Sequence, residues 1–231
     1  MDSELLTHLE HLTQSTNKTP SQLKQDAVAL FFNDFKKNGF FVEFGACDGF
    51  SFSNTWVLEK FFDWNGLLAE PNPQWHSAIK QNRGCKIDLR AVAARTGEFV
   101  EFGVMDNVNP IEKELGGITE YLDKSIRDLA QTFKVETVSL HDLLYVWQSP
   151  TTIDYISIDT EGNELSILEK FDFSEYQFNF LSIEHNYRPE RPKLQEIMAR
   201  NGYVRLDCDT LSYFDDWYIH NSHALANLVH G

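Results

Sequence analysis

The chain has 231 residues, 42% of them hydrophobic, and a formal net charge of -15. This length suits one α/β domain with a full core, and the charge argues against a general attraction for nucleic-acid phosphates or anionic lipid. No run reaches the ~20 apolar residues of a membrane span, no signal peptide is recognisable, and the three cysteines lack metal-type spacing. We therefore expect a soluble cytoplasmic protein with no nucleic-acid partner.

Residues 1–38 predict a helical extension ahead of a main domain at 39–231. Leucines recur at helical spacing within 2–14, and an apolar face runs through 21–37, so we expect two helices separated by a polar linker. Thr19-Pro20 resembles a helix start. The amphipathic helices are candidates for a docking arm or for a contact between copies of the chain.

From residue 39 apolar strands alternate with amphipathic helices. We expect strands at 39–45, 65–73, 85–94, 97–105, 152–162 and 179–186, with two more around a turn in 203–220. We expect helices at 53–62, 73–82, 137–147, 163–171 and 191–202. Such alternation predicts a mostly parallel sheet with helices on both faces and an antiparallel strand pair at its end. The charged segment 106–134 contains Asn-Pro and Gly-Gly, and we predict that it is a lid insertion.

Polar residues gather where the first three strands end. In doubly wound sheets ligands bind at the carboxyl ends of the strands. Glu70 lies 25 residues after Gly45, at the place where a carboxylate commonly accepts both hydroxyls of a ribose. The candidate cofactor-binding residues at these strand ends are Glu43, Gly45, Asp48, Glu70, Asn72 and Asp88.

The first loop indicates which nucleoside would bind. Its sequence, E-F-G-A-C-D-G, has Cys47 where a dinucleotide loop has its second glycine, and it has no Walker motif. A ligand with a ribose, no phosphate and a positive charge fits better, and S-adenosylmethionine is such a ligand. Two alternatives stay open: Glu43 could be a core acid bonded to backbone, and Gly45 and Gly49 could be plain turn glycines. A nicotinamide site is a further option, which the loop chemistry disfavours.

Five segments resemble, in order, motifs of the FkbM-type methyltransferase family. They are FVEFGACDGFSFSNTWVLEK, GLLAEPNP, AVAARTGEFVEF, IDYISIDTEGNELSILEKFDF and FLSIEHNY. The resemblance implies a class I methyltransferase fold, which is a Rossmann-like, mostly parallel sheet of seven strands, and S-adenosylmethionine as cofactor. It also implies O-methylation of sugars or other hydroxylated small molecules. By the resemblance Glu43, Gly45, Asp48 and Glu70 fall in the cofactor site, whereas 106–134 matches poorly.

A second group of polar residues ends two later strands, and two roles are open to it. In the first, His185, Asp159 or Glu184 is the general base that removes a proton from the acceptor. In the second, Asp159, Glu184 and Asn186 hold a divalent cation such as Mg²⁺ or Mn²⁺ that binds the acceptor oxygen. A plainer role, as a cap of the helix near residue 163, is open to Glu161, and also to Glu164.

Together these features predict an S-adenosylmethionine-dependent O-methyltransferase that acts on a saccharide or a similar small acceptor. Two rivals remain. One is an N-methyltransferase of the same fold, and the other is a catalytically inactive S-adenosylmethionine-binding module within a larger assembly.

Overall fold

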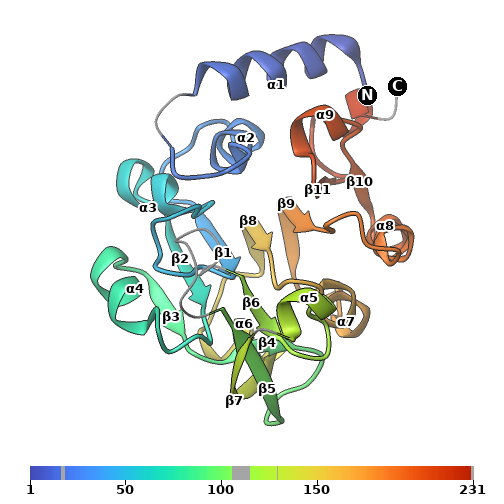
Figure 1. The fold of residues 1–231 in the computed structure, drawn as a ribbon. Coiled ribbons are helices and arrows are strands. Elements are labelled where there is room, and N and C mark those ends of the chain that lie inside the picture. The colour runs from blue at the N-terminus through green and yellow to red at the C-terminus, as the bar shows by residue number, and fades with distance from the viewer. Residues whose placement is uncertain (17–18, 106–114, 129, 230–231) are drawn as a thin grey trace.

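The computed structural model describes residues 1–16, 19–105, 115–128 and 130–229. Its centre is a seven-stranded sheet with a smaller four-stranded sheet beside it (Figure 1). The order in the large sheet is β3 (Lys86–Asp88), β2 (Asn65–Ala69), β1 (Phe40–Phe44), β8 (Thr152–Ile158), β9 (Gln177–Glu184), β11 (Asp215–His220) and β10 (Tyr203–Arg205). Its first five strands follow the doubly wound order, and β11 runs antiparallel to both neighbours. The predicted mostly parallel sheet with an antiparallel strand near its end is confirmed.

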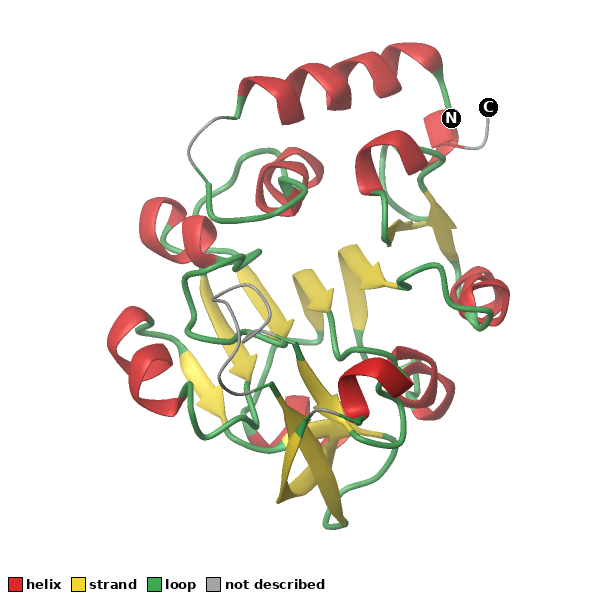
Figure 2. Ribbon diagram, viewed as in Figure 1, coloured by secondary structure: helices red, strands yellow, loops and turns green. Residues whose placement is uncertain are grey.

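Helices lie on both faces of the large sheet (Figure 2). The helices of the described residues are α1 (Ser3–Ser15), α2 (Gln25–Phe32), α3 (Trp56–Phe62), α4 (His76–Asn82), α5 (Lys124–Arg127), α6 (Leu140–Val146), α7 (Glu164–Lys170), α8 (Arg191–Arg200), α9 (Asp209–Ser212) and α10 (Ala226–Val229). Of these, α5 lies beside the smaller sheet (Figure 1). No helix within the described residues is both long and apolar enough to cross a bilayer.

Two hydrophobic cores, one on each face, hold these layers together. Because side chains alternate along a strand, Phe41 of β1 packs in the core that contains α1 to α4, whereas Val42 packs in the core that contains α6, α7 and α8. Both residues are fully buried. The sheet is therefore buried on both sides, as its nearly continuous apolar strands predict.

The N-terminal helices pack onto the fold rather than standing apart. Leu5 and Leu9 of α1 are buried in the same core as Val28 of α2. The second helix is shorter than predicted and starts at Gln25, because Lys24 takes a left-handed conformation with φ 65 that a helix interior does not allow. A contact between chains through these helices stays a prediction.

The segment 85–94, predicted as one strand, is two strands in two different sheets. The carboxylate of Asp88 accepts a hydrogen bond from the backbone N–H of Arg90 (3.0 Å), which turns the chain after β3. The chain then enters the second sheet. The order of strands in that sheet is β4 (Ala91–Ala93), β7 (Gln131–Ser139), β5 (Phe99–Val104) and β6 (Gly116–Ile118).

The predicted lid, 106–134, overlaps this second sheet. Residues 106–114 and 129 lie outside the described residues; the described part contains β6, α5 and the start of β7. The helix predicted from 137 begins at Leu140, since 137–139 still belong to β7, and Ser139 caps the helix by accepting from the N–H of Asp142. A lid function of this region stays a prediction.

Candidate active site

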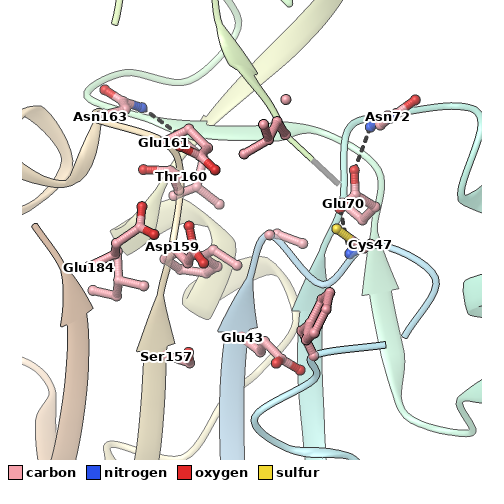
Figure 3. Close-up of a pocket in the computed structure, with 18 of the residues that line it drawn as sticks. Glu43, Cys47, Glu70, Asn72, Ser157, Asp159, Thr160, Glu161, Asn163 and Glu184 are labelled. Carbon is pink, nitrogen blue, oxygen red and sulfur yellow. Dashed lines mark hydrogen bonds between the residues drawn. The ribbon is translucent and has the colours of Figure 1, made fainter. Parts of the chain in front are cut away.

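A cavity of about 340 Å³ opens where β1, β2, β8 and β9 end (Figure 3). The acids that line it are Glu43, Glu70, Asp123, Asp159, Glu161, Glu184 and Asp215. Among the described residues that line it there is no lysine, arginine or histidine. Such a cavity disfavours phosphate groups and favours a ligand or ion with positive charge.

The loop after β1 lines the cavity, and a glycine allows it to come this close. Gly45 has φ +71, and a Cβ atom at this position would lie 2.3 Å from the carbonyl oxygen of Asp159 at the end of β8. Only glycine combines this backbone conformation with so close an approach of two strand ends. Gly45 is thus a turn glycine that also lines the cavity, and its contact with a cofactor stays a prediction.

Glu43 lines the cavity, but its carboxylate is bonded within the chain. It accepts hydrogen bonds from the Asn54 N–H (2.6 Å), the Thr55 hydroxyl (2.5 Å) and the Ser53 hydroxyl (3.0 Å). Arg83, whose side chain is fully buried, lies 3.4 Å away. These donors fix the loop that leads into α3. The core-acid alternative thus describes what the structure shows, and contact between Glu43 and a cofactor stays a prediction.

Asp48 and Asp88 do not line the cavity. Asp48 accepts from the N–H groups of Phe50 (2.8 Å) and Ser51 (2.7 Å) and closes the turn after Gly45. Asp88 is bonded to the Arg90 guanidinium (2.6 and 2.9 Å). Burial opposes ionisation of Asp88, but the hydrogen bonds from Arg90 and from the indole of Trp147 together outweigh it and lower its pKa. Both acids are bonded within the chain and shape loops beside the cavity.

Glu70, the predicted ribose-binding acid, lies in the cavity, and its contact with a ribose stays a prediction. It is 3% exposed, lines the cavity at the end of β2, and accepts the backbone N–H of Cys47 on one oxygen (2.8 Å) and that of Asn72 on the other (2.7 Å). Burial raises its pKa to about 7. Each oxygen retains lone pairs for a further donor, so the group is held in position and can still accept ligand hydroxyls. Asn72 lines the cavity beside it.

The opposite wall is formed by acids that face each other. One oxygen each of Asp159, Glu161 and Glu184 lies within 4.8 Å of the other two (Figure 3). Burial, and then the charge of Glu161, raises the pKa of Asp159 well above its usual range; burial and the charge of Asp159 do the same for Glu184. Simultaneous ionisation of these neighbouring acids is therefore disfavoured unless a cation lies between them.

The two acids of the loop after β8 have different roles. Glu164 accepts from the N–H groups of Thr160 (2.8 Å) and Gly162 (3.1 Å), so it closes the turn that leads into α7. It lies in the first turn of α7, but no side chain of the described residues caps the N–H groups of that helix, so the helix-cap alternative is not what the structure shows. Glu161 has no such bond: its backbone takes φ 61, which places its side chain in the cavity wall. Burial and the charge of Glu164 raise the pKa of Glu161 to about 7.

His185 lies outside the cavity, although Asn186 lines it. The ring of His185 is buried, accepts the N–H of Tyr187 on Nδ1 (3.0 Å), and has Nε2 4.0 Å from the carboxylate of Asp216. Burial lowers its pKa. Because it faces Asp216 rather than Asp159, the structure gives no support to His185 as the general base.

Several lining residues were not expected from the sequence. Asp215, at the start of β11, lies opposite Glu184 in the register of the sheet. Its carboxylate accepts from the side-chain amide of Gln25 (3.0 Å), so the N-terminal segment forms part of the wall. Asp215 could have been found from an antiparallel strand that starts where β9 ends; Gln25 gives no signal in the sequence.

The cavity fits S-adenosylmethionine by its chemistry. An oriented carboxylate, Glu70, follows β2; a glycine, Gly45, brings the backbone close after β1; and no basic side chain is found among the described lining residues. The cofactor carries an ammonium and a sulfonium, which an acidic cavity favours. An acidic lining of this kind does not fit a pyrophosphate, which needs hydrogen-bond donors or positive charge.

Comparison with known proteins agrees with this chemistry. The model of the methyltransferase FkbM domain matches residues 43–217. No curated protein matches the chain. A precorrin-6y C5,15-methyltransferase from Geobacter metallireducens aligns at 12% identity over 78% of this chain and 71% of its own, with a TM-score of 0.40.

Two further structures are similar at the same level. An S-adenosylmethionine-dependent methyltransferase from Aquifex aeolicus aligns at 12% identity over 93% of this chain and 97% of its own, with a TM-score of 0.40. One from Geobacter sulfurreducens, in complex with S-adenosylhomocysteine, aligns at 9% identity over 87% and 72%, with a TM-score of 0.38. On the family match, which spans most of the sequence and the whole cavity edge of the sheet, the chain belongs to the FkbM family of S-adenosylmethionine-dependent methyltransferases.

Proposed function

We propose that this methyltransferase acts on a hydroxyl oxygen of a saccharide or a similar small hydroxylated acceptor. The observation that carries the proposal is the contrast between the two ends of one cavity. Glu70 is oriented by two backbone N–H groups at one end. At the other end Asp159 and Glu184 converge with few donors of their own. The first end suits the nucleoside of the cofactor, and the second suits an acceptor that must lose a proton.

Glu70 would accept the ribose hydroxyls, and the backbone around Gly45 would lie along the methionine part of the cofactor. The bound cofactor supplies a methyl group on a positively charged sulfur. The chain has to hold the acceptor in line with that methyl group and exclude water. The enclosing wall of β6 and α5, which contributes Ile118 and Ile126 to the cavity, serves the second purpose.

The proton of the acceptor hydroxyl goes to the Asp159–Glu184 pair. As the new O–C bond forms and the C–S bond breaks, the sulfur becomes neutral and the hydroxyl proton moves to a carboxylate oxygen. Only an ionised carboxylate of the pair can accept this proton. His185 has no part in this step, because its ring lies outside the cavity.

Amide side chains support a hydroxylated acceptor. Gln22, Asn54 and Asn186 line the cavity, and each can both donate to and accept from a hydroxyl group. Phe52 also lines it and is 37% exposed, so its ring offers an apolar face near the opening. This mixture of amides, carboxylates and an aromatic face suits a sugar better than an apolar acceptor.

The test combines calorimetry with a turnover assay. We expect S-adenosylmethionine to bind the purified chain. We also expect S-adenosylhomocysteine to form when hydroxylated acceptors are added. The first acceptors to test are monosaccharides and disaccharides that carry no nucleotide. Failure to bind the cofactor would refute the proposal. Cofactor binding without turnover on any hydroxyl acceptor, but with turnover on amines, would identify an N-methyltransferase. Binding with no turnover on either class would favour the inactive module.

A further inference from the structure

The three acids on the β8–β9 side of the cavity lie close together, and the only opposite charge that acts on them in the described structure is that of Arg188 on Glu161. We call Asp159, Glu161 and Glu184 the carboxylate trio. Within the described residues, none of the three forms an ion pair; the ion pairs of the fold join other acids. Three ionised groups so close together repel one another strongly when burial removes water from between them.

Arg188 is the guanidinium that approaches the trio; two of its nitrogens donate elsewhere, and its buried Nε has no hydrogen-bond partner among the described residues. It donates to the carbonyl oxygens of Tyr121 (2.8 Å) and Glu161 (3.1 Å), and its Nη2 lies 3.8 Å from the carboxylate of Asp123. Arg188 therefore fixes the backbone of Glu161 against the second sheet. It leaves the carboxylate of Glu161 facing the cavity without a bound cation.

Glu184 provides an observation independent of the clustering. Its side chain is more than nine-tenths buried, and its Oε2 atom has no hydrogen-bond partner in the described structure. Buried carboxylate oxygens rarely stay without a donor or a cation. Two things can satisfy this atom: a proton shared with Asp159, or a cation from outside.

The charge of the cofactor does not balance this wall. S-adenosylmethionine has two positive groups and one carboxylate, so its net charge is +1, whereas the cavity is lined by seven acids. Glu43 and Glu70 already have hydrogen-bond donors from the chain. The carboxylate trio lacks such donors.

We propose that the carboxylate trio binds a divalent cation of the Mg²⁺ or Mn²⁺ type, with Asp159, Glu161 and Glu184 as ligands. Carboxylate oxygens are the ligands that these hard ions prefer. Each residue offers one ligand atom, so the second oxygens stay available to the acceptor proton. This set has Glu161 in place of Asn186, which the sequence predicted, because the left-handed backbone of Glu161 places its side chain there. The ligand class implied is an acceptor with a pair of neighbouring hydroxyls, since these can complete the coordination of one ion.

The part of the inference that concerns an acceptor with two neighbouring hydroxyls rests on the proposed function. The ion site itself does not depend on the cofactor. Binding of Mn²⁺ is therefore measured on the chain without cofactor, from the loss of the electron paramagnetic resonance signal of free Mn²⁺, with Mg²⁺ as competitor. We expect one bound ion that Mg²⁺ displaces, and a rise of several degrees in the midpoint of thermal unfolding at saturating Mn²⁺.

Two single substitutions, one in each wall, make the test specific. Glu161→Gln should weaken Mn²⁺ binding by at least about tenfold and leave the affinity for S-adenosylmethionine nearly unchanged. Glu70→Gln should weaken the binding of S-adenosylmethionine and leave the binding of Mn²⁺ nearly unchanged. Glu101→Gln, a change at an exposed position on β5, should alter neither. Thermal unfolding of each variant checks that it folds, and the half-buried position of Glu161 makes this variant the safest of the trio to substitute.

No binding of Mn²⁺ at millimolar concentration would overturn the inference and leave the shared proton as the only partner of Glu184. Equal Mn²⁺ binding by the wild type and Glu161→Gln would also overturn it. If the chain binds Mn²⁺ but no cofactor, the proposed function fails and the ion site stands. If it binds the cofactor but no ion, only the ion site fails.

Discussion

The two walls of the cavity treat their acids in opposite ways. On the wall of β1 and β2, Glu43 is surrounded by hydroxyl, amide and guanidinium donors, and Glu70 by two backbone N–H groups. On the wall of β8 and β9, Asp159, Glu161 and Glu184 face one another without an ion pair in the described structure. One wall is complete within the chain, and the other needs a proton or a ligand.

This difference suggests different tasks for the two walls, with cofactor binding on the first wall and proton transfer or ion binding on the second. A binding site for a constant cofactor gains affinity when its groups are already fixed by the chain. A site that must take a proton, or hold an ion, needs groups whose charge is not yet compensated. We therefore expect substitutions in the first wall to act on folding and cofactor affinity, and substitutions in the second wall to act on turnover.

Neutralising the second wall should have the largest effect. Asp159→Asn removes one partner of the proposed base pair, and we expect the rate of methyl transfer to fall by about 10²- to 10⁴-fold. Cofactor affinity should be nearly unchanged. The formation of S-adenosylhomocysteine measures the rate of methyl transfer, and calorimetry measures the affinity for the cofactor. The exposed change Glu101→Gln is the control. A rate within a factor of about two of the wild type would remove Asp159 from the mechanism.

Replacing the buried guanidinium of Arg83 in the first wall should lower the stability of the fold instead. Arg83 donates to Glu59 (2.7 Å) and to the hydroxyls of Ser53 (3.1 Å) and Thr55 (2.8 Å), and its side chain is fully buried. Arg83→Leu leaves buried acceptors unpaired, so we expect a loss of about 3–5 kcal/mol in the free energy of unfolding. Urea unfolding measures the loss.

The matched control for Arg83 is Arg95→Leu, because the Arg95 side chain is 74% exposed and forms only a weak surface pair with Glu98. Its unfolding free energy should change by less than about 1 kcal/mol. Similar losses in the two variants would contradict the view that the first wall is held together by its buried guanidinium.

The stability of the chain should depend on pH through Asp215, the acid that bonds the N-terminal segment. Burial raises the pKa of Asp215 from 3.8 to about 7. Between these values the folded chain keeps a proton that the unfolded chain has lost. The contribution of Asp215 to stability is therefore present in full below pH 3.8 and lost as the pH rises through 7.

Asp215→Asn removes this dependence. Between pH 4 and 8 the wild type should lose up to about 4 kcal/mol relative to the variant, a difference that chemical unfolding at several pH values measures. The same substitution at Asp128, an exposed position, should leave the slope unchanged. A constant difference between wild type and Asp215→Asn at every pH would show that Asp215 titrates normally.

The smallest effect is expected at the ribose end. Glu70→Gln keeps the shape of the side chain and removes its charge, so we expect the dissociation constant of S-adenosylmethionine to rise about 10- to 100-fold, which corresponds to about 1.4–2.7 kcal/mol. Because the pKa of Glu70 is raised to about 7, the wild type should also bind more tightly at pH 8 than at pH 6. The variant should lose that pH dependence. Equal affinities of the two proteins at pH 8 would exclude Glu70 from the site.

Much of the first wall could be predicted from the sequence. Strand ends marked by Gly45 and Glu70 indicate a nucleoside site because periodicity and chain order already place both at one edge of the sheet. Prediction was weaker where the partner of a side chain decides its role. Asp48 and Asp88 look like ligand acids in the sequence, yet the first is bonded to neighbouring N–H groups and the second to Arg90.

The second wall was less predictable, for a similar reason. Asp159 and Glu184 could be paired because their strands are neighbours. His185 could not be excluded, since a single turn after β9 decides which side its ring faces, and that turn is fixed by hydrogen bonds to Phe214. Glu161 and Glu164 could not be told apart in advance: one closes the turn and the other enters the cavity because of one left-handed backbone angle.

The hydrogen bond from Gln25 to Asp215 joins the N-terminal segment to a strand near the other end of the chain. The family match begins only at Glu43, so part of the cavity wall is built by sequence that precedes the shared core. Acceptor preference could therefore change through substitutions at Gln22 or Gln25 while every family motif stays intact. A version trimmed to residues 43–217 would lose α1, α2 and most of the central strand β1, so it would lack part of the core as well as this wall and could not report on acceptor selectivity.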